Sequence, residues 1–301
     1  MLTRHVQRNL TWIDLVTPTP AEVRALMVEF DLDPHVAEEL LVQSFKSKVE
    51  RHRDTIYAIL HFPLLRGNQR PEQEIDFVIG KHFLITTRYN TTDPLHAFAK
   101  VFEVNSVLGR GTALHGGHVF VEMVRSLYLA LADEFTIIAR RLQDIEDQIF
   151  KGDERKMVFE ISHVGRIIHD FRQALSPHRE MLSSLETTST RFFGAEFLHY
   201  MHDLESVYSR MERSLENIRD SLIELRETNN SLLSTKQSEV MKTLTVLAFI
   251  FLPLSFIANL FAMNTINNPI VGNSFDFWII VGSMTGIAVI FFIYFKRKGW
   301  L

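Results

Sequence analysis

The chain has 301 residues, a formal net charge of −4 at pH 7 and no cysteine. The lack of cysteine excludes disulfide frameworks and thiolate metal sites, and it suits a reducing cytoplasm for the large N-terminal part. Residues 243–301 hold one acidic and three basic residues, so residues 1–242 hold the other 35 acids and 29 bases, a net charge of −6. A mildly acidic soluble part argues against nucleic acid as a partner.

An α/β domain is predicted over residues 1–112, starting with a short strand at 12–15. Three times, a capping Thr or Asp stands directly before a proline, which is typical of a helix start. The helices predicted from these starts lie at 21–30, 35–42 and 93–107. Strand-like segments rich in Ile, Phe, Val and Thr lie at 55–65, 74–79 and 82–88. Because the domain has no phosphate-binding glycine loop and no nucleophile elbow, we expect neither an enzyme nor a bound cofactor.

Long helices are predicted from residue 118 onward. Amphipathic segments cover 118–150 and 154–185, with a kink expected at Ser176-Pro177, so 113–193 is an antiparallel long-helix region. A third helix begins near Gly194, and its part 194–242 is a stalk. Apolar residues recur along the stalk in steps of four and three, with Asn229 at the skipped position: Met211, Leu215, Ile218, Leu222, Leu225 and Leu232. This spacing keeps one face against a partner helix, as in a coiled-coil seam.

Two uncharged apolar runs lie near the end of the chain, at 243–262 and 277–295. Each is long enough to cross a hydrocarbon core of about 30 Å at about 1.5 Å per residue. Lysines precede the first run, the basic tail 296–301 follows the second, and the loop 263–276 has no Lys or Arg. The positive-inside rule therefore places both termini in the cytoplasm. Two spans cannot enclose a water path, so a pore needs several copies around one axis.

The C-terminal third contains the segment EVMKTLTVLAFIFLPLSFIANLFAMN, the second apolar run and the closing KRKGWL. In these segments the chain resembles a known family, the CorA divalent-cation channels. The family has Gly-Met-Asn at the end of its first span, where this chain has Ala262, Met263 and Asn264. Sparser similarity at 12–15 (WIDL) and 177–185 (PHREMLSSL) extends the resemblance over the whole chain.

The resemblance implies the architecture and the activity. It implies an α/β cytoplasmic domain followed by long helices and a two-helix transmembrane hairpin, assembled as a funnel-shaped homopentamer in the plasma (bacterial inner) membrane. The stalk would continue into the first span, and this span would line the pore. The implied function is passive flow of Mg²⁺, with Co²⁺ and Ni²⁺ as further ions. The partners are then other copies of the chain, the lipid bilayer and divalent cations.

One face of the first span is smaller and more polar than the opposite face. We call it the polar stripe, and it consists of Ser238, Met241, Thr245, Ala248, Leu252, Ser255 and Asn259. Polar residues within a span face protein or water rather than lipid. Small residues also allow close helix–helix packing, so the stripe alone leaves packing and pore lining open. The family resemblance favours the pore, with Met241, Thr245 or Leu252 as candidate constrictions.

Asn264 is the candidate outer filter. A ring of amide oxygens can bind the water shell of Mg²⁺ without removing it, and the matching Asn has this role in the family. An ordinary helix C-cap is the alternative. Two departures bear on selectivity: Ala262 replaces the glycine, whose backbone freedom shapes the turn, and the loop has one Asp and no Glu, which weakens cation focusing.

A second candidate metal site lies near the start of the stalk. His199, His202 and Asp203 stand at i, i+3 and i+4, which places them on one helix face with a donor set suited to Zn²⁺. Asp203 also falls where the family has a regulatory aspartate that binds divalent ions between subunits. The alternative is a solvated helix face. His115-Gly116-Gly117-His118 is expected to be a flexible loop before a helix.

Three functions remain open at this point. The first is a homo-oligomeric Mg²⁺ channel, and the second is a zinc transporter of the ZntB type with the same architecture. The third is a membrane-anchored structural or regulatory oligomer, which the missing glycine and the acid-poor loop motivate. The spans contain no acidic residue that could relay protons, so passive flux is favoured over proton coupling.

Overall fold

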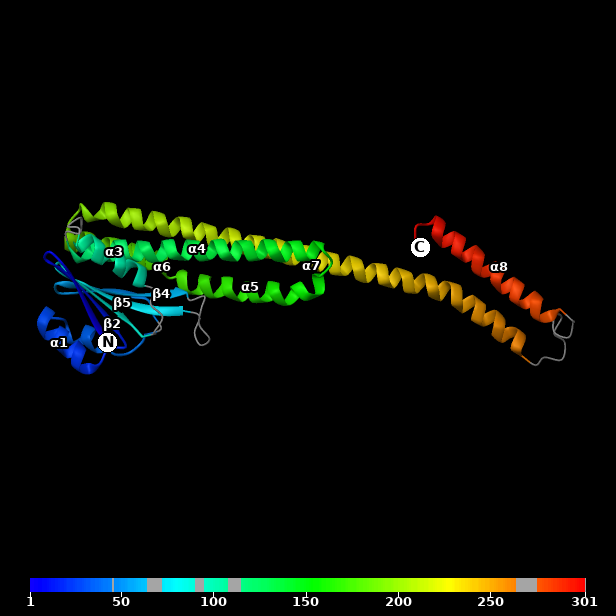
Figure 1. Ribbon diagram of the computed structural model, residues 1–301, viewed down its shortest axis with the longest axis horizontal. Coiled ribbons are helices and arrows are strands. Elements are labelled where there is room, and N and C mark those ends of the chain that lie inside the picture. Colours follow the sequence, from blue (N-terminus) through cyan, green and yellow to red (C-terminus); the bar gives the residue numbers. More distant parts are fainter. Residues whose placement is uncertain (45, 64–71, 90–94, 108–114, 264–274, 301) are drawn as a thin grey trace. The chain divides into compact units, whose positions relative to one another are not determined.

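The computed structural model describes residues 1–44, 46–63, 72–89, 95–107, 115–263 and 275–300. They form two compact units, Met1–Arg226 and Glu227–Leu301. Figure 1 shows that a single long helix, α7 (Phe197–Ala262), belongs to both units. The predicted α/β domain, long helices and two C-terminal apolar helices are confirmed.

Unit 1 contains a six-stranded sheet in the order β1-β2-β6-β5-β4-β3. Neighbouring strands are antiparallel except β2 and β6, which are parallel. The strands are β1 (Leu2–Gln7), β2 (Leu10–Val16), β3 (Lys48–His52), β4 (Thr55–Pro63), β5 (Glu72–Ile79) and β6 (Phe83–Arg88). The edge strands β1 and β3 were not predicted from the sequence. β1 buries one of its residues and β3 buries none, so neither strand shows the apolar alternation by which a half-buried strand is recognised.

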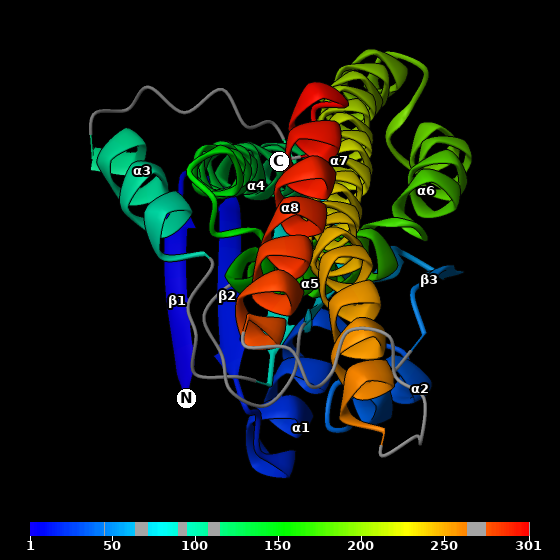
Figure 2. The same cartoon turned by 90° about the vertical axis from the view of Figure 1, so that its right-hand side faces the viewer.

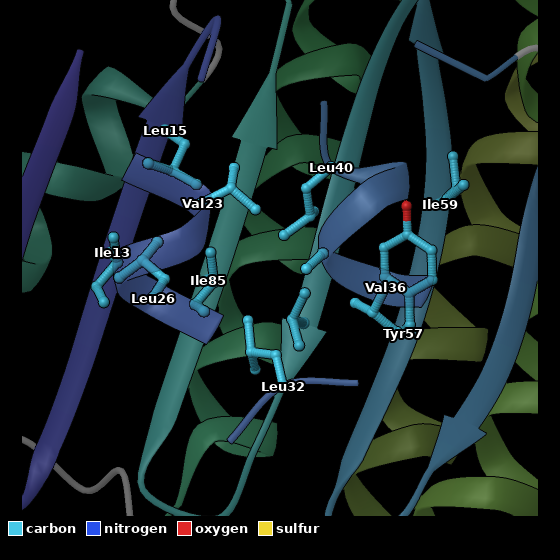
Figure 3. Close-up of a cluster of buried hydrophobic side chains, with 12 residues drawn as sticks. Ile13, Leu15, Val23, Leu26, Leu32, Val36, Leu40, Tyr57, Ile59 and Ile85 are labelled. Carbon is cyan, nitrogen blue, oxygen red and sulfur yellow. The ribbon is translucent and has the colours of Figure 1, made fainter. Parts of the chain in front are cut away.

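One face of the sheet packs against α1 (Pro20–Phe30) and α2 (Pro34–Glu39). Figure 3 shows Val23 and Leu26 of α1 pointing at strand residues such as Ile13 and Ile85, all nearly inaccessible to solvent. Both helices start at the predicted caps. Thr19 forms a capping box, in which its Oγ1 accepts from the Glu22 amide at 3.3 Å and its amide donates to Glu22 Oε2 at 2.9 Å.

The opposite face packs against longer helices. They are α3 (His96–Val107), α4 (Gly116–Phe150), α5 (Glu154–Leu175) and α6 (His178–Phe193). Trp12 meets the ring of Phe98 edge-on at 5.5 Å, and Phe77 meets Phe120 at 5.1 Å. The sheet is therefore buried on both faces, and all nine residues of β4 are buried.

The segment predicted as one kinked helix over 154–185 forms two helices. α5 ends at Leu175 and α6 begins at His178, because Pro177 has no amide hydrogen to continue the helical ladder. The break lets His178 point into the core, where its side chain is fully buried.

The predicted seam of α7 is occupied within the chain as far as Leu225. Met211, Leu215, Ile218, Leu222 and Leu225 are all at most 8% exposed. A Cβ on Gly165 of α5 would lie 3.3 Å from the Leu222 side chain, so α5 supplies the partner helix at this point. This part of the seam is thus intramolecular packing and gives no support to association between copies.

Candidate ion path and metal sites

In the part of the chain that the structure describes, two helices are long and apolar enough to cross a membrane, judged by length and composition, and their apolar segments lie in unit 2. They are the second half of α7 and α8 (Asp276–Arg297), which runs back beside α7 in Figures 1 and 2. Only 6% of the apolar window of α7 and none of that of α8 is buried within the chain. Such a surface is stable only against lipid or against other protein, because water would have to solvate the whole of it.

The polar stripe of α7 is open within the chain. Met241 is 56% exposed and Leu252 is 69% exposed. Ser238, Ala248, Ser255 and Asn259 are exposed as well, and Thr245 is half-buried. Thr245 Oγ1 donates to the Met241 carbonyl at 2.7 Å, so its proton is used within the helix and its lone pairs are left for a ligand.

α8 packs on the face of α7 next to the polar stripe. Val246 is fully buried, and the ring of Phe249 lies 6.1 Å from that of Phe295, which is 7% exposed. Val246 and Phe249 each follow a stripe residue by one position, a rotation of about 100° around the helix. The hairpin therefore leaves the polar stripe uncovered.

The residue that replaces the family's glycine lies in ordinary helical backbone. Ala262 is the last residue of α7, and it is not one of the residues with positive φ. A Cβ is tolerated in this conformation, which removes the steric objection to alanine at this position. Met263 follows and is 61% exposed. Asn264 and residues 265–274 lie outside the described residues, so the filter stays a prediction.

The three predicted ligands on the stalk do not converge within one chain. His199 Nε2 lies 3.7 Å from Asp203 Oδ2, and both side chains are well exposed. His202 turns the other way, where its Nε2 lies 3.7 Å from Glu186 Oε1 of α6. Among the described residues, no three His, Cys, Asp or Glu side chains are grouped to hold a metal ion. A site at His199 and Asp203 would need ligands from another copy.

The segment expected to be a flexible loop, His115 to His118, opens α4 instead. A Cβ on Gly116 would lie 2.2 Å from the Phe83 carbonyl oxygen and 2.3 Å from that of Gly80, so only glycine allows the helix to approach the sheet this closely. The His115 ring stacks on Phe193 at 4.0 Å. Burial lowers the pKa of His115 to about 4, so the imidazole is neutral at pH 7.

His178 is a buried connection that the sequence did not reveal. Its Nδ1 accepts from the Tyr128 hydroxyl at 2.9 Å, and its Nε2 donates to the His61 carbonyl at 2.9 Å. β3 pairs with β4 no further than Ile59, so this carbonyl lies beyond the pairing. Burial lowers the pKa of His178 to about 4, and the ring bonds α6 to the sheet in its neutral form. The predicted kink at Ser176-Pro177 and the family resemblance over 177–185 were its only sequence signals.

A second buried polar group lies beneath α2. Asp76 Oδ2 accepts from Tyr89 at 2.8 Å and from Tyr57 at 3.2 Å. Burial and the neighbouring charge of Glu74 raise the pKa of Asp76 well above its usual range. Glu74 accepts from the Ser44 amide at 2.8 Å. These contacts anchor the segment after α2 to the sheet.

Comparisons with known proteins agree with this architecture. Residues 7–297 match the family described as CorA-like Mg²⁺ transporter protein. The cobalt/magnesium transport protein CorA of Thermotoga maritima is 25% identical over 299 residues, covering 97% of this chain and 83% of the relative. The zinc transport protein ZntB of Yersinia pseudotuberculosis is 24% identical over 307 residues, covering 96% and 88%.

A solved structure also matches in fold. The CorA magnesium transporter of Methanocaldococcus jannaschii superposes with a TM-score of 0.84 at 20% identity, covering 97% of this chain and 92% of that chain. The similarity includes the α/β unit, the long helices and the C-terminal apolar pair, so the order of elements along the chain is shared.

Proposed function

Because the chain belongs to the family of CorA-like Mg²⁺ transporter proteins, we propose that it conducts Mg²⁺ passively across the plasma membrane, through a path shared by several copies. Membership makes it a divalent-cation transporter. The ion, the passive mechanism and the assembly are the parts that we propose.

The observation that carries the proposal is the open polar stripe of α7. α8 covers the neighbouring face, whereas the polar residues Ser238, Ser255 and Asn259 of the stripe are exposed. A polar face left uncovered in a membrane requires water or another protein surface. Several α7 helices around one axis would satisfy this need, with their stripes facing a common water path. The number of five copies follows from the family resemblance, and the placement of both chain termini in the cytoplasm follows from the positive-inside rule.

Passive flow needs no coupled reaction. A doubly charged cation that enters a cell at −100 mV gains roughly 4.6 kcal/mol, at about 2.3 kcal/mol per charge. Residues 243–262 and 277–295 contain no Asp or Glu that could carry a proton across. The membrane potential alone therefore supplies a sufficient driving force.

The choice of Mg²⁺ rests on the chemistry of Asn264. Its amide offers a neutral, hard oxygen that suits a hydrated Mg²⁺ and contributes little to Zn²⁺, which prefers nitrogen and sulfur donors. Zinc transport is the alternative, since ZntB is nearly as similar to this chain as CorA is. His199 and Asp203, which are exposed on α7, would serve either function as a cytoplasmic site between copies that senses the ion.

Ion uptake into liposomes tests the proposal. Mg²⁺ and Zn²⁺ uptake would be measured for the purified chain, for Asn264→Ala and for Asn268→Ala, a control in the same loop. We expect Mg²⁺ uptake that Asn264→Ala abolishes and Asn268→Ala preserves. Zn²⁺ uptake without Mg²⁺ uptake would establish the zinc alternative. If neither ion moved, the third function, an oligomer without selective transport, would replace both.

A further inference from the structure

The end of α8 has a defined backbone structure. The Trp300 amide donates to the Phe295 carbonyl at 3.0 Å, and the Gly299 amide donates to the Lys296 carbonyl at 3.2 Å. Gly299 has φ +67°, and Trp300 stacks on Phe295 with the ring centroids 5.8 Å apart. These bonds and the apolar contact form a Schellman motif. A Cβ at residue 299 would meet nothing within 4 Å, so space does not require a glycine here. The positive φ does, because residues with a side chain rarely adopt it.

Lys242 of α7 binds this motif from a position 57 residues earlier in the chain. Its Nζ donates to the Gly299 carbonyl at 2.6 Å and lies 5.9 Å from the centre of the Trp300 ring. The Gly299 carbonyl lies just beyond the last turn of α8, close to the negative end of the helix dipole. A lysine ammonium is therefore the right group for this place, and the Trp300 face adds a cation–π contact.

The apolar contact between α7 and α8 lies next to the bond between Lys242 and Gly299. Among the described residues of unit 2, the buried apolar side chains are Val246 and Phe295. Lys242, Val246 and Phe249 stand at i, i+4 and i+7, on one face of α7. Phe249 contacts Phe295, which in turn stacks on Trp300. Polar and apolar contacts thus join the helices along one line.

We propose that Lys242, Gly299 and Trp300 form a clasp that positions the inner end of α7 for ion conduction. Lys242 stands beside Met241, and Thr245 lies one turn further along the same helix, so the clasp sets the rotation of the polar stripe at this level. Rotation of α7 about its axis would carry Met241 and Thr245 out of the path. Lys242 acts through α7 and does not touch the ion. This inference rests on the proposed function.

Uptake of Mg²⁺ into liposomes by the full chain is the first test. Lys242→Met keeps the length of the side chain and removes the charge and the donors, and we expect uptake to fall roughly tenfold, as for loss of one charge-assisted hydrogen bond. Lys242→Arg restores a donor and is expected to conduct within about twofold of the native chain. Lys296→Met removes the same charge from a neighbouring side chain, and Lys296 takes part in the motif through its backbone carbonyl, which the substitution keeps, so native uptake is expected.

The outcomes separate positioning from general effects. Native uptake by Lys242→Met overturns the proposal. An equal loss in Lys242→Met and Lys296→Met overturns it too, because total charge at the inner surface would then be the cause. If Lys242→Arg does not conduct like the native chain, a basic hydrogen-bond donor at this position is not what positions α7. That result also overturns the proposal. If Lys242→Met does not fold, Trp300→Ala removes the stacked ring from the far side of the clasp, and native uptake by that variant counts against the proposal.

A second measurement does not depend on transport. In a chain with Trp12→Phe and Trp278→Phe, Trp300 is the one tryptophan left. We expect Lys242→Met to increase quenching of its fluorescence by acrylamide, a neutral quencher that does not respond to the lost charge, and Lys296→Met to leave the quenching unchanged. Unchanged quenching in Lys242→Met refutes the clasp even if the chain conducts. If the native chain moves no divalent ion while the quenching changes as expected, the proposed function fails and the contact stands.

Discussion

β4 in unit 1 and α8 in unit 2 are both rich in apolar residues, but they differ in how far these residues are buried within the chain. Every residue of β4 is buried, whereas Phe295 is the one buried apolar residue of α8 among those described. Unit 1 is held together by contacts within the chain. Unit 2 exposes most of its apolar side chains, so lipid or other copies must supply the contacts that it lacks. Substitutions should therefore affect the free energy of unfolding very differently in the two units.

The largest contrast is expected between two phenylalanines. Phe77 is fully buried against Phe120, and Phe77→Ala should lower the free energy of unfolding by about 3–5 kcal/mol. Phe251 of α7 is 63% exposed, and Phe251→Ala should change the free energy of unfolding by less than about 0.5 kcal/mol. Denaturant titration of the detergent-solubilised chain, followed by fluorescence, measures both. Equal losses would show that the units do not differ in this way.

Acid should weaken unit 1 through His178. Its pKa is about 4 in the folded chain against 6.5 when unfolded, so the unfolded chain binds more protons between these values. Stability is therefore complete above pH 6.5 and is lost as the pH falls toward 4, by roughly 3 kcal/mol at 1.36 kcal/mol per unit. Denaturation at several pH values would show this slope, and His178→Gln should reduce it. An unchanged slope in the variant would assign the acid sensitivity to other groups.

Two glycines give a smaller contrast. Gly116→Ala places a Cβ against the backbone of the sheet, and we expect a loss of about 1–3 kcal/mol. Gly286 of α8 has nothing within 4 Å of its Cβ position, so Gly286→Ala should cause no loss. Thermal unfolding of both variants measures the difference. Tolerance of alanine at 116 would mean that α4 can move away from the sheet at little cost.

The smallest effect is expected at the surface of unit 1. Arg4 forms two hydrogen bonds to the Glu29 carboxylate, at 2.9 and 2.7 Å, and both side chains are more than 40% exposed. Arg4→Ala should lower the free energy of unfolding by about 0.5 kcal/mol, and salt should reduce the difference. Denaturation at low and high ionic strength tests this. A loss that is larger and independent of salt would mean that the side chain acts through packing.

Short sequence patterns correctly predicted the elements whose formation depends on residues close together in the chain. The caps at Thr19 and Asp33 started helices as expected, because a capping side chain needs only the next two or three amides. The two apolar helices near the C-terminus were likewise evident from length and composition. The edge strands β1 and β3 were missed, since they bury few side chains and therefore lack the apolar alternation of a half-buried strand.

The candidate site was predicted less completely. The polar stripe could be drawn from helical spacing, whereas the face that α8 covers could not. Spacing also placed His202 with His199 and Asp203, but Glu186 of α6 turns it away. Lys242 was noted only as a charge that orients the first span. Its bond to Gly299 joins two positions that are distant in the sequence, and no local pattern indicates such a pair.

By itself, the sequence determined the α/β start, the helical middle, the two apolar spans and the resemblance to a family of divalent-cation transporters. Each of these depends on composition or on periodicity along one element. Only the tertiary structure decided that α5 fills part of the stalk seam, that His178 connects α6 to the sheet, and that Lys242 holds the end of α8. These contacts join residues 50 to 117 positions apart, and their geometry exists only once the chain has folded.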